Sequence, residues 1–214
     1  MADKLKHYRD KRDFGRTPEP AGDGGCGRAE AESAPRFVIQ KHDASTLHYD
    51  FRLEVDGVLV SWAVPKGPSL DPRVRRLAIP TEDHPLGYID FEGVIPAGEY
   101  GAGAVIVWDT GLYANPKERP IGEQIAAGQV EVVLAGRKLS GGFALIRTGK
   151  DAKARWLLIK MKDDYAAPGR SVTSDEPRSV LSGRTLAEVE EAAAAANVAN
   201  GEKGTGPDPD PDQP

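Results

Sequence analysis

The 214-residue sequence lacks the features of secreted, disulfide-stabilised or membrane-spanning proteins. Its single cysteine, Cys26, has no partner in the chain, which excludes an internal disulfide framework and a thiolate metal site built within the chain. No run of 18 apolar residues is present, and the amino-terminal residues MADKLKHYRDKRD lack the apolar stretch of a signal peptide. We therefore expect a soluble cytoplasmic protein that does not enter a membrane.

The sequence also lacks an overall excess of positive charge, since its formal net charge is −5. Residues 185–214 contain seven acidic residues and one lysine, which gives −6 and leaves +1 for residues 1–184. The first sixteen residues carry six Lys or Arg against three Asp. A nearly neutral body with a basic arm is compatible with a nucleic-acid partner, although it does not demonstrate one.

Between Arg36 and about Lys162, short β-rich runs alternate with clusters of Gly, Pro and Asp, and no helical stretch is long enough for repeated βαβ units. The runs are RFVIQK, LHYDFRLEV, VLVSWAVP, RRLAIP, AVIVWD, VEVVLA, GFALIRT and RWLLIKMK. About eight strands at this spacing predict a mainly β protein, either a sandwich or a barrel.

Composition predicts four parts: a basic arm ending in a Gly-rich flexible linker, a β-rich domain, an extension with a helix, and a disordered acidic tail rich in Pro and Asp. The expected boundaries are 1–34, 35–166, 167–200 and 201–214. Strong helix formers place the helix at about 185–199, with Thr185 as its N-cap and Glu188 three residues further on.

The segment LHYDFRLEV has two chemically different faces. Because strand residues alternate, one face is apolar and the other polar. The apolar face contains Leu47, Tyr49, Phe51, Leu53 and Val55, and the polar face contains His48, Asp50, Arg52 and Glu54. The turn Asp56-Gly57 predicts a hairpin in which Trp62 and Val64 join the core, while the small residues Ser61 and Ala63 lie opposite Arg52 and Asp50. That polar face therefore has room for an ion and a phosphate.

Imidazole and carboxylate groups together suit a first-row transition metal. His48 and Asp50 can reach one ion from the same strand, and His42 can join them from the preceding strand end or loop. Arg52, on the same face, offers a planar fork to phosphate oxygens. A lone histidine on a strand is more often structural or solvent-facing, so the spacing alone leaves both interpretations open.

A second segment, RRLAIPTEDHP, is expected to repeat this geometry if no bulge intervenes. Arg76, Glu82 and His84 would then share one face, with Leu77 and Ile79 on the other. Pro80 weakens this prediction because proline is confined to sheet edges and bulges, so a solvated edge strand is the alternative.

Two further patterns have structural rather than functional interpretations. The glycines of AGEYGAG, Gly98, Gly101 and Gly103, lack the spacing and the following Lys-Ser/Thr of a nucleotide-binding loop, which favours turns. The three tryptophans, Trp62, Trp108 and Trp156, lie in apolar strands and are expected in the core rather than on a base-stacking surface.

The segments FVIQKHDASTLHYDFRLEVDGVLVSWAVPKGPSLDP and EDHPLGYIDFEGVIPAGEYGAG resemble the phosphoesterase domain of bacterial DNA ligase D. The similarity extends from YRDKRDFGRTPEP to PRSVLSGRTLAEV, roughly residues 8–190. It implies a small closed β-barrel with a crescent-shaped active-site groove, an N-terminal arm and a C-terminal helix. It also implies a manganese-dependent enzyme of non-homologous end joining. Such an enzyme removes a 3′-terminal ribonucleoside and then the 3′-phosphate from primer-template DNA, leaving a 3′-hydroxyl.

The resemblance also implies roles for individual residues. His42, His48 and Asp50 match metal ligands, while Arg52 and His84 match phosphate contacts. Lys66, Arg76, Glu82 and Tyr88 match further active-site positions. Arg12, Asp13 and Glu19 match positions in the arm that supports activity. His84 could bind phosphate as an imidazolium or protonate the leaving oxygen, and the sequence does not decide between these roles.

No polymerase or ATP-dependent ligase domain fits within this chain. We therefore expect a stand-alone, monomeric version that cooperates with a separate repair ligase or polymerase in trans. Two other functions stay open: a non-catalytic module that binds DNA ends and recruits a ligase, and a structural β-barrel adaptor. A complete set of metal ligands argues against the first, and a polar face opposite the core argues against the second.

Overall fold

The computed structural model of the protein describes residues 3–22, 34–149 and 155–201. The expected linker up to residue 34 and the expected tail from residue 201 fall almost wholly outside these ranges. The described elements, in chain order, are α1 (Lys6–Asp10), β1 (Arg36–Asp43), β2 (Leu47–Val55), β3 (Val58–Val64), β4 (Arg75–Pro80), β5 (His84–Pro85), η1 (Leu86–Asp90), β6 (Gly93–Ile95), β7 (Gly103–Ala114), α2 (Ile121–Ala127), β8 (Gln129–Gly136), β9 (Ser140–Thr148), β10 (Arg155–Lys160), α3 (Val172–Asp175) and α4 (Leu186–Gly201).

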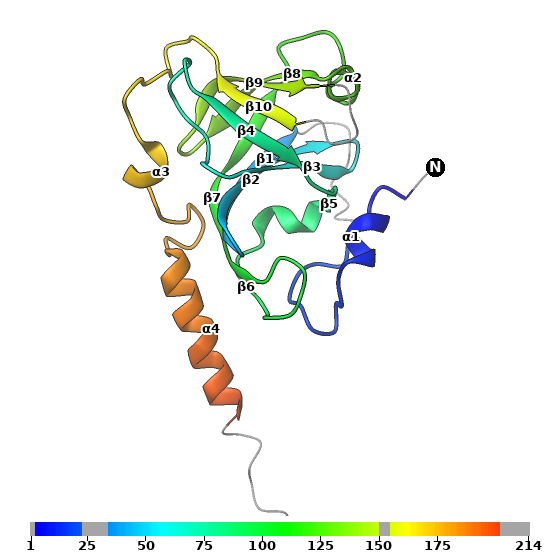
Figure 1. The fold of residues 1–214 in the computed structure, drawn as a ribbon, viewed down its shortest axis with the longest axis vertical. Coiled ribbons are helices and arrows are strands. Elements are labelled where there is room, and N and C mark those ends of the chain that lie inside the picture. The colour runs from blue at the N-terminus through cyan, green and yellow to red at the C-terminus, as the bar shows by residue number, and fades with distance from the viewer. Residues whose placement is uncertain (1–2, 23–33, 150–154, 202–214) are drawn as a thin grey trace, which may run out of the picture.

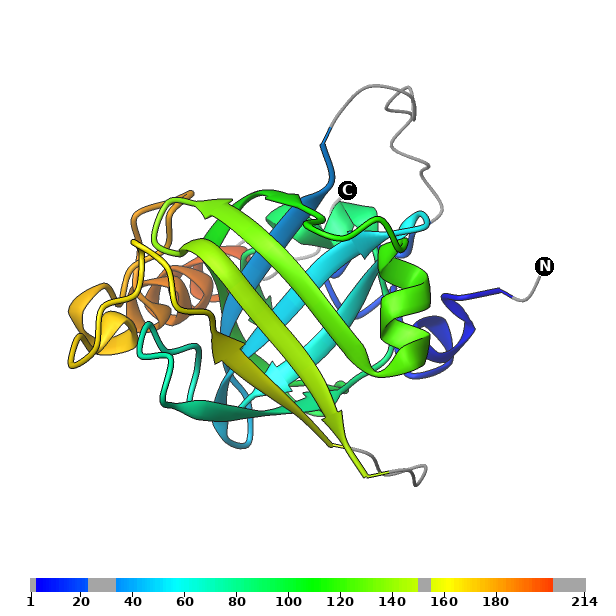
Figure 2. The same cartoon turned by 90° about the horizontal axis from the view of Figure 1, so that it is seen from above.

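Eight antiparallel strands close into a barrel, which decides between the two predicted architectures. Their order is β1-β2-β3-β4-β10-β9-β8-β7, and pairing of β7 with β1 closes the ring (Figures 1 and 2). The two short strands are additions outside this ring, because β5 pairs with β3 and β6 with β7. Closure removes the exposed edges that an open sheet would leave.

The hairpin of β2 and β3 forms in the predicted register. Asp56 and Gly57 both adopt positive φ, as a tight two-residue turn requires. Tyr49 lies opposite Val64, and Asp50 lies opposite Ala63. This register sends the apolar residues of β2 into the barrel and the polar residues to its outer face.

The three tryptophans lie in the barrel core, as predicted, and Trp62 and Trp156 pack edge to face with their ring centroids 5.7 Å apart. Tyr49 packs in the same way against Trp108 at 5.3 Å. One expectation for this face is wrong: Leu47 is 41% exposed. It is the first residue of β2, next to the turn that follows β1, and it lies beyond the end of the core.

The prediction of one continuous strand over RRLAIPTEDHP is wrong. Strand β4 ends at Pro80, which has no N–H for further ladder bonds, and His84 and Pro85 form the separate strand β5 against β3. The alternative of an edge strand is also wrong, because β4 is paired with both β3 and β10. Arg76 lies opposite the buried Leu158 and so shares the inner face of β4.

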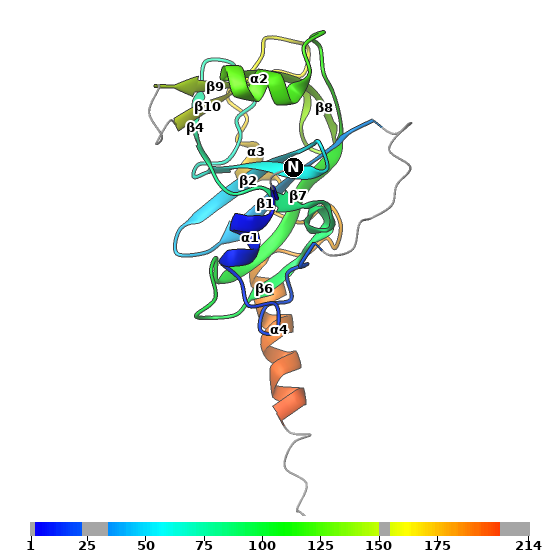
Figure 3. The same cartoon turned by 90° about the vertical axis from the view of Figure 1, so that its right-hand side faces the viewer.

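A second apolar cluster covers part of the barrel's outer face. It consists of Tyr8, Val38, Leu59, Tyr88, Ile89 and Val107. Tyr8 is contributed by α1 in the arm, and its hydroxyl donates to the Pro20 carbonyl at 2.8 Å. Figures 1 and 3 show α1 against the outside of the barrel. The described part of the arm is therefore docked, despite a composition that suggests disorder.

The predicted carboxyl-terminal helix is confirmed as α4, which extends away from the barrel (Figure 1). The Thr185 N–H donates to Glu188 Oε2 at 2.7 Å, and the Glu188 N–H donates to Thr185 Oγ1 at 3.3 Å, which completes the expected capping box. The short helix α2 was not anticipated from the sequence. Within the three described ranges, no helix is long and apolar enough to cross a membrane.

Replacing Tyr49 by Ala should destabilise the protein by about 3 kcal/mol, because loss of the ring leaves a cavity beside Trp108. The control Leu47→Ala, on the same face of the same strand, should change the free energy of unfolding by less than about 0.5 kcal/mol because Leu47 is exposed. Urea unfolding followed by tryptophan fluorescence measures both values. Equal effects would contradict the assignment of the core face of β2.

Candidate metal centre and phosphate pocket

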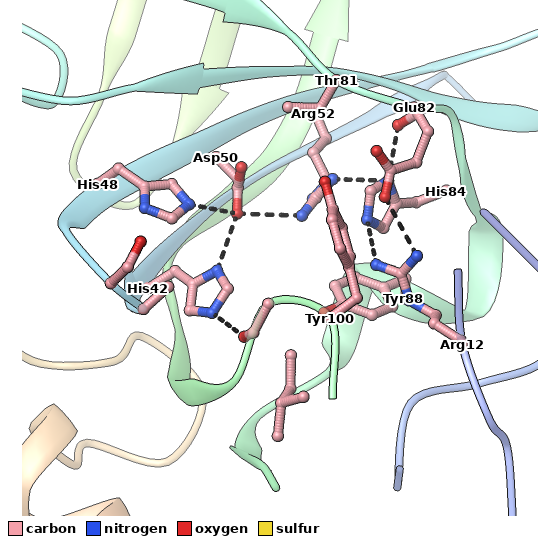
Figure 4. A pocket seen from close by; sticks show the side chains of 14 residues that line it. Arg12, His42, His48, Asp50, Arg52, Thr81, Glu82, His84, Tyr88 and Tyr100 are labelled. Atoms are coloured by element: carbon pink, nitrogen blue, oxygen red, sulfur yellow. Dashed lines mark hydrogen bonds and ion pairs between the residues drawn. The ribbon is translucent and has the colours of Figure 1, made fainter. Parts of the chain in front are cut away.

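The outer face of β1 and β2 forms the floor of a pocket of about 250 Å³. Residues of the arm, of the Thr81–His84 segment, of η1 and of the turn before β7 complete its wall (Figure 4). The lining residues are Arg12, His42, Ala44, Ser45, His48, Asp50, Arg52, Thr81, Glu82, His84, Tyr88, Ile95, Tyr100 and Gly101.

Strand pairing brings the three candidate metal ligands together. His42 on β1 lies directly opposite His48 on β2, and Asp50 is the next residue on the same face of β2. Asp50 Oδ2 lies 3.6 Å from His42 Nδ1 and 3.5 Å from His48 Nε2. The three side chains therefore converge on one point and could hold a metal ion.

One backbone carbonyl sets the tautomer of each of the two histidines. His42 Nε2 lies 2.8 Å from the Gly101 carbonyl, and His48 Nδ1 lies 2.8 Å from the Thr46 carbonyl. A carbonyl only accepts hydrogen bonds, so these nitrogens carry the protons. In the neutral imidazoles the lone pairs then lie on His42 Nδ1 and His48 Nε2, the two nitrogens that face Asp50. Such outer contacts are typical of metal-binding histidines, and this donor set suits a first-row transition ion.

Arg52 is buried beside this group, and its guanidinium is held on several sides. It donates to Gln40 Oε1 at 2.8 Å and to Ser61 Oγ at 2.9 Å, and Nη2 lies 3.1 Å from Asp50 Oδ2. Burial acts to raise the pKa of Asp50, but the charge of Arg52, together with hydrogen bonds from the two imidazoles when these are protonated, outweighs burial and holds that pKa well below its usual value. Asp50 is therefore ionised and available as a ligand.

His84 lies between two guanidinium groups. Its Nδ1 is 2.9 Å from Arg52 Nη1 and 2.8 Å from the Glu82 carbonyl, and its Nε2 is 3.4 Å from Arg12 Nη2. Burial lowers the pKa of His84, and the positive charges of Arg52 and Arg12 lower it further, to well below its usual value. The imidazole is therefore neutral near pH 7 when the pocket holds no anion.

The arm supplies the second guanidinium. Arg12 Nε lies 2.9 Å from Glu19 Oε1, Nη1 lies 3.1 Å from Glu82 Oε1, and the guanidinium stacks on the Tyr8 ring at 3.9 Å. Burial acts to raise the pKa of Glu82, but hydrogen bonds from its own backbone N–H, from Lys11 and from Arg12 together outweigh burial, so that the pKa is lowered. Glu82 thus links the arm to the pocket.

Most of the site residues expected from the sequence gather here, although three do not. Tyr88 is buried with its ring 4.9 Å from the ring of His84, and Glu19 lies behind Arg12. Asp13 is exposed in a turn, where its carboxylate accepts from the Gly15 N–H at 3.0 Å. Lys66 is exposed after β3, and Arg76 lies on the inner face of β4, so neither lines the pocket.

Sequence reasoning missed Gln40, Tyr100 and Gly101. Gln40 shares a strand face with His42, so alternation along β1 could have identified it. Tyr100 and Gly101 lie in the Gly-rich segment interpreted only as turns. The positive φ values of Gly98 and Gly101 agree with turns, but no local pattern indicates that the Gly101 carbonyl contacts His42.

The sequence is similar to those of known proteins. A model of the DNA ligase D 3′-phosphoesterase domain family matches residues 40–147, about half of the chain. The chain is 53% identical over 185 residues to the multifunctional non-homologous end joining protein LigD of Pseudomonas aeruginosa, covering 85% of this chain and 22% of that protein. It is 49% identical over 170 residues to the multifunctional non-homologous end joining DNA repair protein LigD of Mycobacterium tuberculosis, covering 76% of this chain and 20% of that protein. The chain thus spans about a fifth of the length of these relatives.

Glu19→Gln should loosen the arm, because it removes the charge of a buried partner of Arg12 at a cost of about 1.5–3 kcal/mol. Amides of residues 3–22 should then exchange with deuterium about 10- to 100-fold faster, since 1.4 kcal/mol corresponds to a factor of ten. Asp10→Asn, in the exposed Lys6–Asp10 pair, is the control and should leave exchange unchanged. Equal exchange in both variants would show that the buried pair does not hold the arm.

His48→Ala should reduce the affinity for Mn²⁺ by more than about a hundredfold, because it removes one of three converging ligands. The free energy of unfolding without metal should change by less than about 1 kcal/mol, because His48 faces outward. Isothermal titration calorimetry and urea unfolding give the two values. His7→Ala, at an exposed histidine of α1, is the control. Undiminished Mn²⁺ binding by His48→Ala would remove it from the ligand set.

Proposed function

Because the chain belongs to the family of DNA ligase D 3′-phosphoesterase domains, we propose that it is a metal-dependent enzyme that trims the 3′ ends of broken DNA. It removes a 3′-terminal ribonucleoside and then the remaining 3′-phosphate, leaving a 3′-hydroxyl for non-homologous end joining. The observation that carries this proposal is the convergence of His42, His48 and Asp50 beside the buried Arg52.

His42, His48 and Asp50 would hold the ion, and manganese is the preferred one in this proposal. When bound, such an ion supplies Lewis-acid stabilisation of the phosphate and lowers the pKa of a coordinated water. Two imidazoles in the donor set favour a transition metal over magnesium, which prefers oxygen ligands.

The two guanidiniums would bind the phosphate. Arg52 cannot swing away, because Gln40, Ser61 and Asp50 hold it. Arg12 approaches from the arm, on the other side of His84. Preorganised positive charge next to non-bridging oxygens stabilises the negative charge that develops as the ester bond breaks.

His84 would serve as the proton donor to the leaving oxygen. Without a ligand it is neutral, because burial and both guanidiniums lower its pKa. A phosphate bound between the guanidiniums offsets their positive charge and so favours uptake of a proton by the imidazole. The protonated ring can then pass that proton to the departing 3′-oxygen or 5′-oxygen.

A non-catalytic DNA-end binder would need the cationic groups but not the oriented histidines. The carbonyls of Gly101 and Thr46 direct one lone pair of each histidine toward Asp50, which supports an enzyme. A structural adaptor would not need a charged group as costly to bury as Arg52.

Two parts of the chain would contribute different groups to the site. The barrel of residues 35–166 provides the metal group and Arg52, and the arm before residue 34 provides Arg12 and its support. DNA synthesis and ligation are left to other domains or proteins that act on the same 3′ end.

A primer-template duplex ending in a 3′-phosphate, and a second ending in a single ribonucleotide, test this function. EDTA should abolish release of phosphate and of ribonucleoside, and Mn²⁺ should restore both at a higher rate than Mg²⁺. His48→Ala should be inactive with either ion, and His7→Ala should match the wild type. Full activity in Mg²⁺ alone, or with EDTA present, would contradict the proposed metal chemistry.

A further inference from the structure

Tyr100 presents a solvent-accessible aromatic ring at the mouth of the pocket. Its side chain lines the pocket, yet the residue is 48% exposed, whereas Tyr88 deeper in the pocket is 2% exposed. Charged and polar side chains surround it, so burial in a core does not explain the ring. The proposed mechanism uses the groups behind Tyr100 and leaves Tyr100 itself without a role.

The ring is held in a defined position. Lys11 Nζ lies 4.4 Å from the ring centroid and 3.2 Å from the Tyr100 hydroxyl, and Arg12 Cζ lies 5.4 Å from the centroid. Figure 4 shows the ring nearly edge-on, with Arg12 toward one side and the metal-ligand group toward the other. A tyrosine fixed in this way can receive a flat ligand with little loss of side-chain entropy.

The backbone around Tyr100 is tied to the metal group. Two consecutive tight turns form the segment 96–102. The Glu99 N–H donates to the Pro96 carbonyl at 3.2 Å, and the Ala102 N–H donates to the Glu99 carbonyl at 3.1 Å. The next residue, Gly101, accepts the hydrogen bond that sets the tautomer of His42. The ring therefore has a defined place relative to the groups that would hold the phosphate.

We propose that Tyr100 is a stacking platform for the nucleobase of the nucleotide whose 3′-oxygen carries the phosphate. This inference rests on the proposed function. Arg52, Arg12 and His84 would contact the phosphate and would bind a free phosphate ion as well as a DNA end. For a 3′-phosphate end, the sugar and base of that nucleotide are the groups nearest to the phosphate that distinguish the two. Every base has a π face, so the platform accepts all four bases.

The test combines two substrates with two variants. The primer-template substrates end in a 3′-phosphate on a normal nucleotide or on an abasic one. With the normal end, Tyr100→Leu should raise KM about tenfold, equivalent to about 1.4 kcal/mol, with a much smaller change in kcat. With the abasic end, wild type should already show the higher KM, and Tyr100→Leu should add little to it. Tyr100→Phe should behave like wild type with both substrates.

If Tyr100→Leu raised KM equally with the two substrates, or raised it with neither, the stacking role would be overturned. A KM raised as much in Tyr100→Phe as in Tyr100→Leu would also overturn it, because Tyr100→Phe retains the ring and removes only the hydroxyl contact with Lys11. Melting temperatures of the variants establish that each is folded, as expected for a half-exposed side chain.

A binding measurement separates failure of this inference from failure of the proposed function. A primer-template with 2-aminopurine as the base of the 3′-phosphorylated terminal nucleotide is titrated with protein in the presence of EDTA. Fluorescence should fall with wild type and Tyr100→Phe but not with Tyr100→Leu. If the wild-type protein quenches the fluorescence but releases no phosphate in the separate assay with Mn²⁺, the proposed function is rejected and the stacking platform is not. Quenching by Tyr100→Leu equal to that by wild type would reject the platform.

Discussion

The buried ion pair between Arg52 and Asp50 is the constraint around which the outer face of the barrel is organised. A guanidinium out of water is costly unless its N–H groups find acceptors. Gln40, Ser61 and Asp50 provide acceptors from three neighbouring strands, which fixes the guanidinium. Burial in turn requires a cover, which η1 and the arm provide through the cluster around Tyr8 and Tyr88. The arm also brings Arg12 to the pocket, where it pairs with Glu82.

Strand β2 separates stability from chemistry by its alternation. Tyr49, Phe51 and Leu53 fill the barrel, while His48, Asp50 and Arg52 face the pocket. Substitutions on the inner face should therefore act mainly on folding, whereas substitution of His48, which is outside the buried Arg52–Asp50 pair, should act mainly on ligand binding. The small partners Ser61 and Ala63 on β3 keep the outer face open without weakening the core.

Local pattern was sufficient to predict part of this structure. The alternation in LHYDFRLEV and the Asp56-Gly57 turn predicted the β2–β3 register and the grouping of His48, Asp50 and Arg52. Periodicity did not show where a strand ends, so β4 was extended through Pro80 and Arg76 was assigned to the wrong face. Nor could it show which distant segment covers an outer face. The docked arm, the exposed positions of Asp13 and Lys66, and the contact of Gly101 with His42 all depend on tertiary structure.

The docked arm has a consequence for the order of assembly during translation. The arm leaves the ribosome before the barrel, but the contact of Arg12 with Glu82 spans 70 residues of sequence. His42 and His48 are only six positions apart and meet as soon as one hairpin forms. Because closing a long loop costs more chain entropy than closing a short one, we expect the ion-binding half of the pocket to form first. A nascent chain would then bring its imidazoles together before the arm brings Arg12 to the pocket.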